Sequence, residues 1–206
     1  MRLTAQVHDY LEKQLQPGDL VIDATAGNGH DCLKIAQLIA PNGSLIAIDR
    51  QPQAIENSLN RLKTHNLEKL CQFIEGNHAD TLSTMVEEYA GQVTSIVFNL
   101  GYLPGSDKLI RTTPADTVAA LNAAKTLLKP KGLLLVTAYR GHEGGLAEAE
   151  AVAQWMNEFS GTILCHEPDF SPNGTPPILW MARQTMEHDP AEHGVTLENR
   201  PPPAEK

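Results

Sequence analysis

The sequence predicts an α/β fold built on a doubly wound, mostly parallel sheet with helices on both faces. Short apolar runs alternate with amphipathic stretches along the chain, which is the pattern of repeated strand–helix units. The apolar runs are nearly continuous, as expected of parallel strands that are buried on both faces. Turn residues such as Pro17-Gly18 and Pro41-Asn42-Gly43 separate the two kinds of segment.

Seven segments are predicted to be strands and six to be helices. The predicted strands span 20–24, 44–49, 71–75, 94–99, 133–138, 162–165 and 178–182. The predicted helices span 3–15, 31–39, 52–65, 80–89, 114–128 and 145–159. Pro52 and Pro114 suit first helical turns, where a missing N–H is tolerated. The last two strands are joined by a loop without a helix, so we expect them to pair antiparallel.

The length of 206 residues fits one domain with a full core, which we place at 1–184. Residues 185–206 are acidic and rich in proline and hold few apolar side chains, so we predict that they form a disordered tail. The formal net charge of the chain is −9. Such a surface repels phosphate backbones on average, and a nucleic-acid ligand would need a local basic patch.

Three cysteines, Cys32, Cys71 and Cys165, are odd in number and far apart. This pattern is typical neither of a disulfide framework nor of a zinc site, so we expect buried thiols and no metal site. The sequence contains no apolar run of membrane-spanning length and does not begin with a signal peptide. We therefore expect a cytoplasmic protein without a membrane partner.

A glycine-rich loop follows the first predicted strand, with the sequence Asp23-Ala-Thr-Ala-Gly27-Asn28-Gly29-His30-Asp31. Glycines at this position let the backbone approach a ligand, and the N-terminus of the next helix supplies free N–H groups. Taken alone, the pattern is equally typical of a tight strand-to-helix turn.

Two residues favour a nucleoside ligand that lacks a pyrophosphate. Asp49 ends the second strand twenty residues after Gly29, where a carboxylate can accept both hydroxyls of a ribose. Cys32 stands where the third glycine of a dinucleotide fingerprint belongs, and its side chain would hold the helix too far from the strand for a pyrophosphate. S-adenosylmethionine fits both observations as the cofactor.

Four further polar residues are candidates for contact with this cofactor. Asp23 can bind the ammonium of the methionine part directly or through water, although it could also be an ordinary turn carboxylate. Asp31 could contact the cofactor or cap the helix. Asn77 and His78 follow the third strand, where the adenine would lie, and both could instead be ordinary loop residues.

A second cluster, Asn99-Leu100-Gly101-Tyr102-Leu-Pro-Gly105, follows the fourth strand. The carboxyl end of that strand adjoins the first strand at the switch point of a doubly wound sheet. Methyl transfer to nitrogen needs a neutral amine whose hydrogens are held by acceptors. The side-chain oxygen of Asn99 and the backbone of a proline-stiffened loop can supply these acceptors. We predict that Asn99 is catalytic, or otherwise a strand-end cap.

The loop around Asn99 holds the predicted substrate-binding residues Leu100, Gly101 and Tyr102, of which Tyr102 could stack on a base or merely pack. A third cluster, 138–145, lies on the same rim. There Tyr139 or His142 could relay a proton, which makes both candidate catalytic residues.

Three cations are candidates for substrate contacts on this rim. Lys108, Arg111 and Arg140 would bring positive charge to the edge of the site, where an RNA backbone could be tolerated. Alternatively, all three are solvated loop residues.

Together, the motifs at 23–31, 99–105, 107–108, 112–113 and 139–144 resemble a bacterial family known as MnmM or YtqB. The resemblance covers about 3–183 and departs from the family at Arg140, where a histidine is expected.

The resemblance implies a class I (Rossmann-like) methyltransferase fold with a seven-stranded sheet. It also implies methylation of the exocyclic amine of 5-aminomethyl-2-thiouridine at the wobble position of tRNA, in the anticodon stem–loop. It places the cofactor contacts at Gly27, Asn28, Gly29, His30, Asp49, Gln51 and His78. A homodimer would be one way for an enzyme without a separate RNA-binding domain to hold its substrate.

Three alternatives remain open from the residues. The chain could methylate another RNA site or a small amine. It could be a non-catalytic module that binds S-adenosylmethionine. An NAD-linked oxidoreductase is disfavoured by Cys32 at the third-glycine position.

Overall fold

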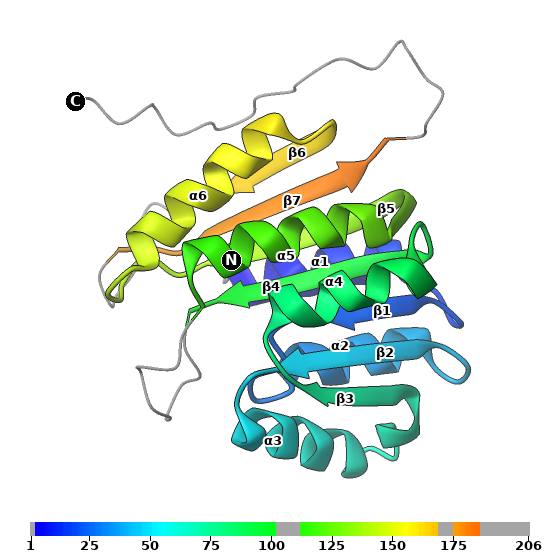
Figure 1. Cartoon of the computed structure of the whole chain (residues 1–206). Helices are drawn as coiled ribbons and strands as arrows, with labels where there is room; N and C mark the ends of the chain where they lie inside the picture. Colours follow the sequence, from blue (N-terminus) through cyan, green and yellow to red (C-terminus); the bar gives the residue numbers. More distant parts are fainter. Residues whose placement is uncertain (1–2, 102–111, 169–174, 186–206) are drawn as a thin grey trace, which may run out of the picture.

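In the computed structural model, residues 3–101, 112–168 and 175–185 are described, and their strands form a single seven-stranded sheet in the order β3-β2-β1-β4-β5-β7-β6 (Figure 1). The strands are β1 Leu20–Asp23, β2 Ser44–Asp49, β3 Cys71–Glu75, β4 Val93–Leu100, β5 Leu128–Ala138, β6 Gly161–His166 and β7 Ile178–Gln184. The helices are α1 Leu3–Gln14, α2 His30–Ile39, α3 Pro52–Lys63, α4 His78–Tyr89, α5 Pro114–Leu127 and α6 Gly145–Glu158, with a 3-10 turn, η1, at Glu68–Leu70.

The order of the strands confirms the predicted doubly wound sheet. β1 pairs in parallel with both β2 and β4, so the winding reverses between β1 and β4. β7 lies between β5 and β6 and is antiparallel to both, which confirms the antiparallel pairing expected of the last strand. The carboxyl ends of β1, β2 and β4 therefore meet at one edge, where ligands of such sheets bind.

Two hydrophobic clusters cover the two faces of the sheet. One packs α4, α5 and α6 against side chains such as Ile22, Phe98 and Val136. The other packs α1, α2 and α3 against side chains such as Val21, Leu45 and Leu135. Neighbouring residues of each strand point to opposite faces, which is why the strands are apolar almost throughout.

Several boundaries differ from those predicted, most of them by one or two residues, and two of the differences are described here. β5 begins at Leu128 rather than at 133, because the chain pairs Leu128 with Val93 across an irregularity before the regular register resumes. α2 begins at His30 with Gly29 at its N-cap, so Asp31 lies inside the first turn and the capping alternative for Asp31 is wrong. None of the described helices is long and apolar enough to cross a membrane.

Candidate functional site

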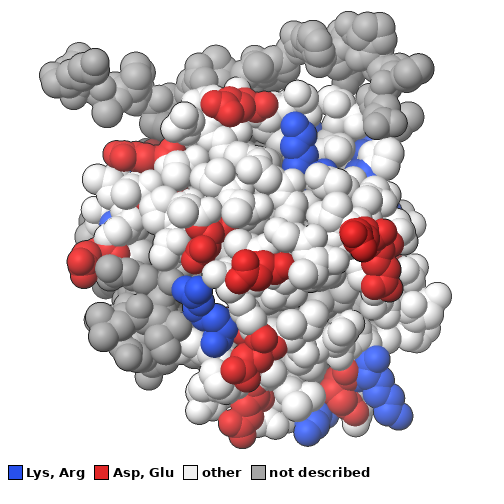
Figure 2. All heavy atoms as spheres, in the orientation of Figure 1, with Lys and Arg blue, Asp and Glu red and all other residues white. Residues whose placement is uncertain are grey.

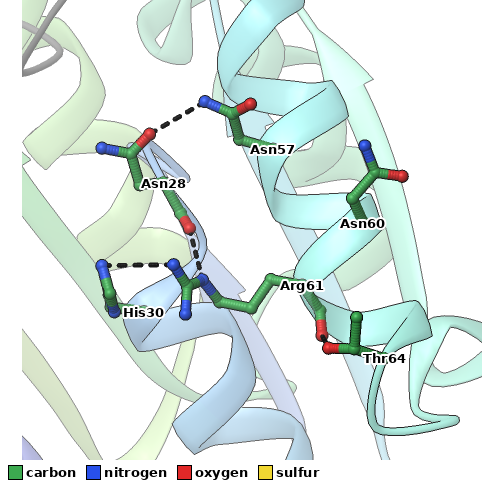
Figure 3. A pocket seen from close by; sticks show the side chains of 6 residues that line it. All are labelled: Asn28, His30, Asn57, Asn60, Arg61 and Thr64. Carbon is green, nitrogen blue, oxygen red and sulfur yellow. Dashed lines mark hydrogen bonds between the residues drawn. The ribbon is translucent and has the colours of Figure 1, made fainter.

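Side chains on one face of α3 donate hydrogen bonds to the glycine loop after β1. Ser58 Oγ donates to the carbonyl oxygen of Gly27 at 3.1 Å, and Arg61 Nε donates to that of Asn28 at 2.6 Å. Asn57 Nδ2 donates to the side-chain oxygen of Asn28 at 2.9 Å (Figure 3). The three α3 residues lie on one side of the helix because Arg61 is four residues after Asn57 and three after Ser58, and helical residues three or four apart share a face. These three residues were not predicted from the sequence.

A pocket of about 470 Å³ lies between this loop and α3, lined by Asn28, His30, Asn57, Asn60, Arg61 and Thr64 (Figure 3). The side chain of His30 faces it, with Nε2 3.4 Å from Arg61 Nη2. The side chains of Asn28 and His30 thus turn toward α3. The contacts of these two residues with a cofactor remain predictions. A cofactor group that bound the side-chain oxygen of Asn28 would compete with Asn57 for that oxygen.

A side chain at Gly29 would collide with the backbone of α3. The φ of Gly29 is +75°, and a Cβ there would lie 2.7 Å from the Cα of Ser58. We expect Gly29→Ala to lower the free energy of unfolding by about 1–3 kcal/mol more than Gly91→Ala. Gly91 has a similar φ of +70° but open space around it, so it controls for backbone strain alone. Urea unfolding measures both, and equal losses would show that the contact with α3 is unimportant.

Asp49, at the end of β2, is held by two backbone groups. Its Oδ2 accepts the N–H of Gly27 and its Oδ1 accepts the N–H of Gln51, each at 3.0 Å. Burial raises the pKa of Asp49, and these hydrogen bonds oppose the effect. Each carboxylate oxygen has a second lone pair, so both can still accept a hydroxyl. The structure thus brings Asp49 and the glycine loop together, as predicted.

Asp23 is fully buried at the end of β1. Cys32 Sγ donates to its Oδ2 at 3.1 Å and the N–H of Thr25 to its Oδ1 at 3.2 Å. Burial, and after it the charge of Asp31, raises the pKa of Asp23 to about 7, while the two hydrogen bonds partly offset the rise. Asp23 is therefore a carboxylate that a bound cation would stabilise.

This raised pKa has a consequence for stability. Between the ordinary value of 3.8 and about 7, the folded protein binds a proton at Asp23 that the unfolded chain has lost. The free energy of unfolding should therefore fall as pH rises through this window, by at most about 1.4 kcal/mol per pH unit. Asp23→Asn should reduce this fall, whereas Asp80→Asn on the exposed surface of α4 should leave it unchanged. Urea unfolding at a series of pH values measures the slope, and a slope unaltered by Asp23→Asn would contradict the assignment.

His78, the first residue of α4, lies against the edge of Phe98, with ring centroids 5.8 Å apart. It is only 7% exposed, and burial lowers its pKa to about 4, so it is neutral near pH 7. A hydrogen bond joins it to the backbone of Ala24, and its Nε2 has no partner among the described residues. Asn77 caps α4 by accepting the N–H of Ala79 at 2.8 Å, which leaves its amide nitrogen for any cofactor contact.

Asn99 is fixed at the end of β4 by two neighbours. Its backbone N–H donates to Thr25 Oγ1 at 2.7 Å, and its side-chain Nδ2 donates to Asp31 Oδ2 at 2.7 Å. A carboxylate only accepts hydrogen bonds, so the nitrogen of the Asn99 amide faces Asp31 and the oxygen points the other way. Asp31 also binds His8 Nε2 through Oδ1 at 2.7 Å. Neither Thr25 nor His8 was predicted from the sequence to be part of the site.

The rim residues after β5 lie beside the loop that follows Asn99. A Cβ on Gly101 would lie 3.4 Å from His142 Nε2 and 3.6 Å from Tyr139 Cβ. Tyr139 is 43% exposed, and burial of its hydroxyl together with the charge of Asp31 raises its pKa. The structure thus brings Asn99, Gly101, Tyr139 and His142 to the same edge, as predicted.

The side chain of Arg140 makes its contacts with a different part of the chain. Its Nε donates to the carbonyl oxygen of Pro176 at 2.7 Å, and its guanidinium pairs with Glu167. The positive charge of Arg140 is thus neutralised while the side chain ties β5 to the segment before β7. This arrangement fits a structural tie better than the predicted contact with substrate.

The segment between β4 and α5 contains Tyr102, Lys108 and Arg111, which lie outside the described residues. Its two ends are joined, because the N–H of Thr112 donates to the carbonyl oxygen of Gly101 at 3.0 Å. Glu148 of α6 is 1% exposed and accepts the hydroxyls of Thr112 and Thr117, each at 2.6 Å. A buried carboxylate therefore holds Thr112, the residue at which the described chain resumes, beside α5 and α6.

A family model described as "Putative rRNA methylase" matches residues 45–181, which is more than half of the chain. The chain belongs to this family. A model of protein-L-isoaspartate(D-aspartate) O-methyltransferase also matches residues 1–85, the part that holds the glycine loop and Asp49.

One relative matches most of this chain. A chloroplastic "tRNA (mnm(5)s(2)U34)-methyltransferase" of Arabidopsis thaliana is 38% identical over 158 residues, covering 73% of this chain. The match spans 57% of the length of the Arabidopsis protein.

Two solved structures cover 89% of this chain and 98% of their own. A "putative rRNA-methylase" of Clostridium thermocellum is 32% identical, with a TM-score of 0.79. A "putative methyltransferase" of Streptococcus mutans, in complex with SAH, is 30% identical, with a TM-score of 0.77. These likenesses and the strand order confirm the predicted class I methyltransferase fold.

Proposed function

We propose that this chain is an S-adenosylmethionine-dependent N-methyltransferase. Its acceptor would be 5-aminomethyl-2-thiouridine at the wobble position of tRNA, and its product 5-methylaminomethyl-2-thiouridine. The observation that carries the proposal is the orientation of the Asn99 amide at the switch point, imposed by Asp31. The tRNA methyltransferase of Arabidopsis thaliana, 38% identical over 73% of this chain, supports the choice of acceptor.

The residues at the edge of the sheet fit S-adenosylmethionine. Asp23 is a buried carboxylate with a raised pKa, suited to the ammonium of the methionine part. Asp49 retains acceptor capacity for the ribose hydroxyls. His78 Nε2, which has no partner within the described part of the chain, is a buried acceptor suited to the amino group of adenine. The bound cofactor supplies the methyl group.

The chain's own residues would position the amine and accept its protons. Asn99 Oδ1, turned away from Asp31, would hold one hydrogen of the neutral amine so that the nitrogen lone pair faces the methyl carbon. As the new N–C bond forms and the S–C bond breaks, the amine must lose a proton. Tyr139 or His142, on the same rim, would pass this proton to solvent.

Acidic and basic side chains are interspersed over the face formed by α4, α5 and α6, without a broad basic area among the residues described (Figure 2). We propose that RNA contact is local, with Lys108 and Arg111 as its cations. The anticodon stem–loop as the binding element, a homodimer and a cytoplasmic location also remain proposals. Gel filtration with light scattering would test the dimer.

The decisive experiment is a methyl-transfer assay with labelled S-adenosylmethionine and tRNA from cells that lack the gene. Nucleoside analysis should find the label in 5-methylaminomethyl-2-thiouridine. Label in another nucleoside would overturn the acceptor but keep the reaction. If no label appears although calorimetry shows that the cofactor binds, the chain is a binding module or acts on a small amine.

A further inference from the structure

α1 contributes one side chain to the edge of the sheet where Asn99 lies. This helix packs through Leu3, Val7 and Leu11 onto the side of the sheet that also carries α2. His8, the residue of α1 that follows Val7, reaches Asp31, with 2.7 Å between His8 Nε2 and Asp31 Oδ1. The other oxygen of Asp31 accepts Asn99 Nδ2, also at 2.7 Å. One carboxylate thus joins α1 to the end of β4.

The two hydrogen bonds of Asp31 fix which atoms of His8 and Asn99 face its carboxylate. A carboxylate accepts hydrogen bonds and donates none, so Nε2 of the His8 ring must carry a proton. With His8 on one oxygen, the carboxylate of Asp31 cannot rotate freely about its last bond. Its second oxygen then stays aimed at the nitrogen of Asn99, which keeps the oxygen of that amide turned toward the substrate side.

We propose that His8 is a positioning residue for methyl transfer. It acts through Asp31 to hold the Asn99 amide in its productive orientation, and the N-terminal helix thereby completes the acceptor site. The inference rests on the proposed function, because it assigns His8 a role in the same site.

Other contacts of α1 should hold the helix when His8 is replaced. Tyr10 Oη and His166 Nε2 are 2.6 Å apart, and Lys34 pairs with Glu12. Arg183 Nη1 also donates to Gln14 Oε1 at 2.6 Å. The effect of His8 on the site can therefore be separated from any effect on the anchoring of the helix.

The test compares His8→Ala and His8→Gln with Tyr10→Phe, which removes a hydrogen bond from the same helix without touching Asp31. We expect His8→Ala to lower kcat about tenfold, with KM for tRNA and the Kd of S-adenosylmethionine changed less than about twofold. His8→Gln keeps an N–H donor and should recover most of the loss. Tyr10→Phe should leave kcat unchanged even where it lowers Tm.

A second readout does not depend on activity. The side-chain amide resonances of Asn99, assigned by their absence in Asn99→Ala, should shift in His8→Ala but not in Tyr10→Phe. Unshifted resonances with unchanged kcat would overturn the role of His8. Equal loss of kcat in His8→Ala and Tyr10→Phe would also overturn it, by assigning the effect to the helix. If the wild-type protein does not methylate tRNA while the resonances shift as expected, the proposed acceptor fails and the positioning contact stands.

Discussion

Replacing Asn99 with alanine is expected to lower kcat for methyl transfer about 100-fold while the Kd of S-adenosylmethionine stays within about threefold. The side-chain oxygen that would orient the amine is lost, whereas the groups proposed to bind the cofactor lie elsewhere, on Asp23, Asp49 and His78. Single-turnover assays with saturating cofactor and tRNA measure the chemical step directly.

Asn60→Ala is the matched control, because Asn60 is an exposed asparagine of α3 away from β4. Asn99→Asp provides a second test. It keeps an oxygen at the acceptor position but places a carboxylate 2.7 Å from Asp31, so the two groups should repel and turnover should stay low. Full activity in Asn99→Ala would remove Asn99 from the acceptor site.

The second large effect is expected on the affinity for S-adenosylmethionine when Asp49 is replaced. Asp49→Ala should weaken the binding of S-adenosylmethionine about 100-fold, the loss of two charge-assisted hydrogen bonds of about 1.5 kcal/mol each. It also frees the N–H groups of Gly27 and Gln51, which Asp49 now accepts. Isothermal titration calorimetry measures the affinity, and thermal unfolding checks that the variant is folded.

The control for Asp49 is Glu75→Ala. Glu75 lies opposite Asp49 in the register of β2 and β3 and is exposed, so it should leave the affinity unchanged. Asp49→Asn keeps one acceptor oxygen and should bind the cofactor with intermediate affinity. If Asp49→Ala folds and binds as the wild type does, the ribose is held elsewhere.

The fold could be predicted closely because its signals are local. Near-continuous apolar strands, proline at the start of α3 and α5, and glycine turns each act within a few residues. The same holds for the convergence of Asp49 and Asn99, since the carboxyl ends of parallel strands must meet at one edge. The early start of β5 was missed because Lys129-Pro130-Lys131 is polar and lacks the pattern of a buried strand.

The partners of the site residues could not be predicted in the same way. His8 lies 23 residues before Asp31, and the distance between them depends on how α1 crosses the sheet. For Arg140, a role was predicted from the sequence, but the partner that the side chain has in the structure was not. Its position on the rim predicted a substrate contact, but its pairing with Glu167 depends on where the β6–β7 connection runs. Such contacts follow from tertiary packing and leave little trace in local sequence pattern.

Because β7 lies between β5 and β6, the sheet can be completed only after the last strand has been synthesised. β6 pairs with β7 alone, so it has no place in the sheet until residues 178–184 have left the ribosome. Until then β5 is an open edge whose residues 133–136 are fully buried in the finished protein. An exposed apolar edge of this kind invites pairing with other chains. A nascent chain stalled before Ile178 would therefore be a natural client for chaperones, although it already contains all six of the described helices.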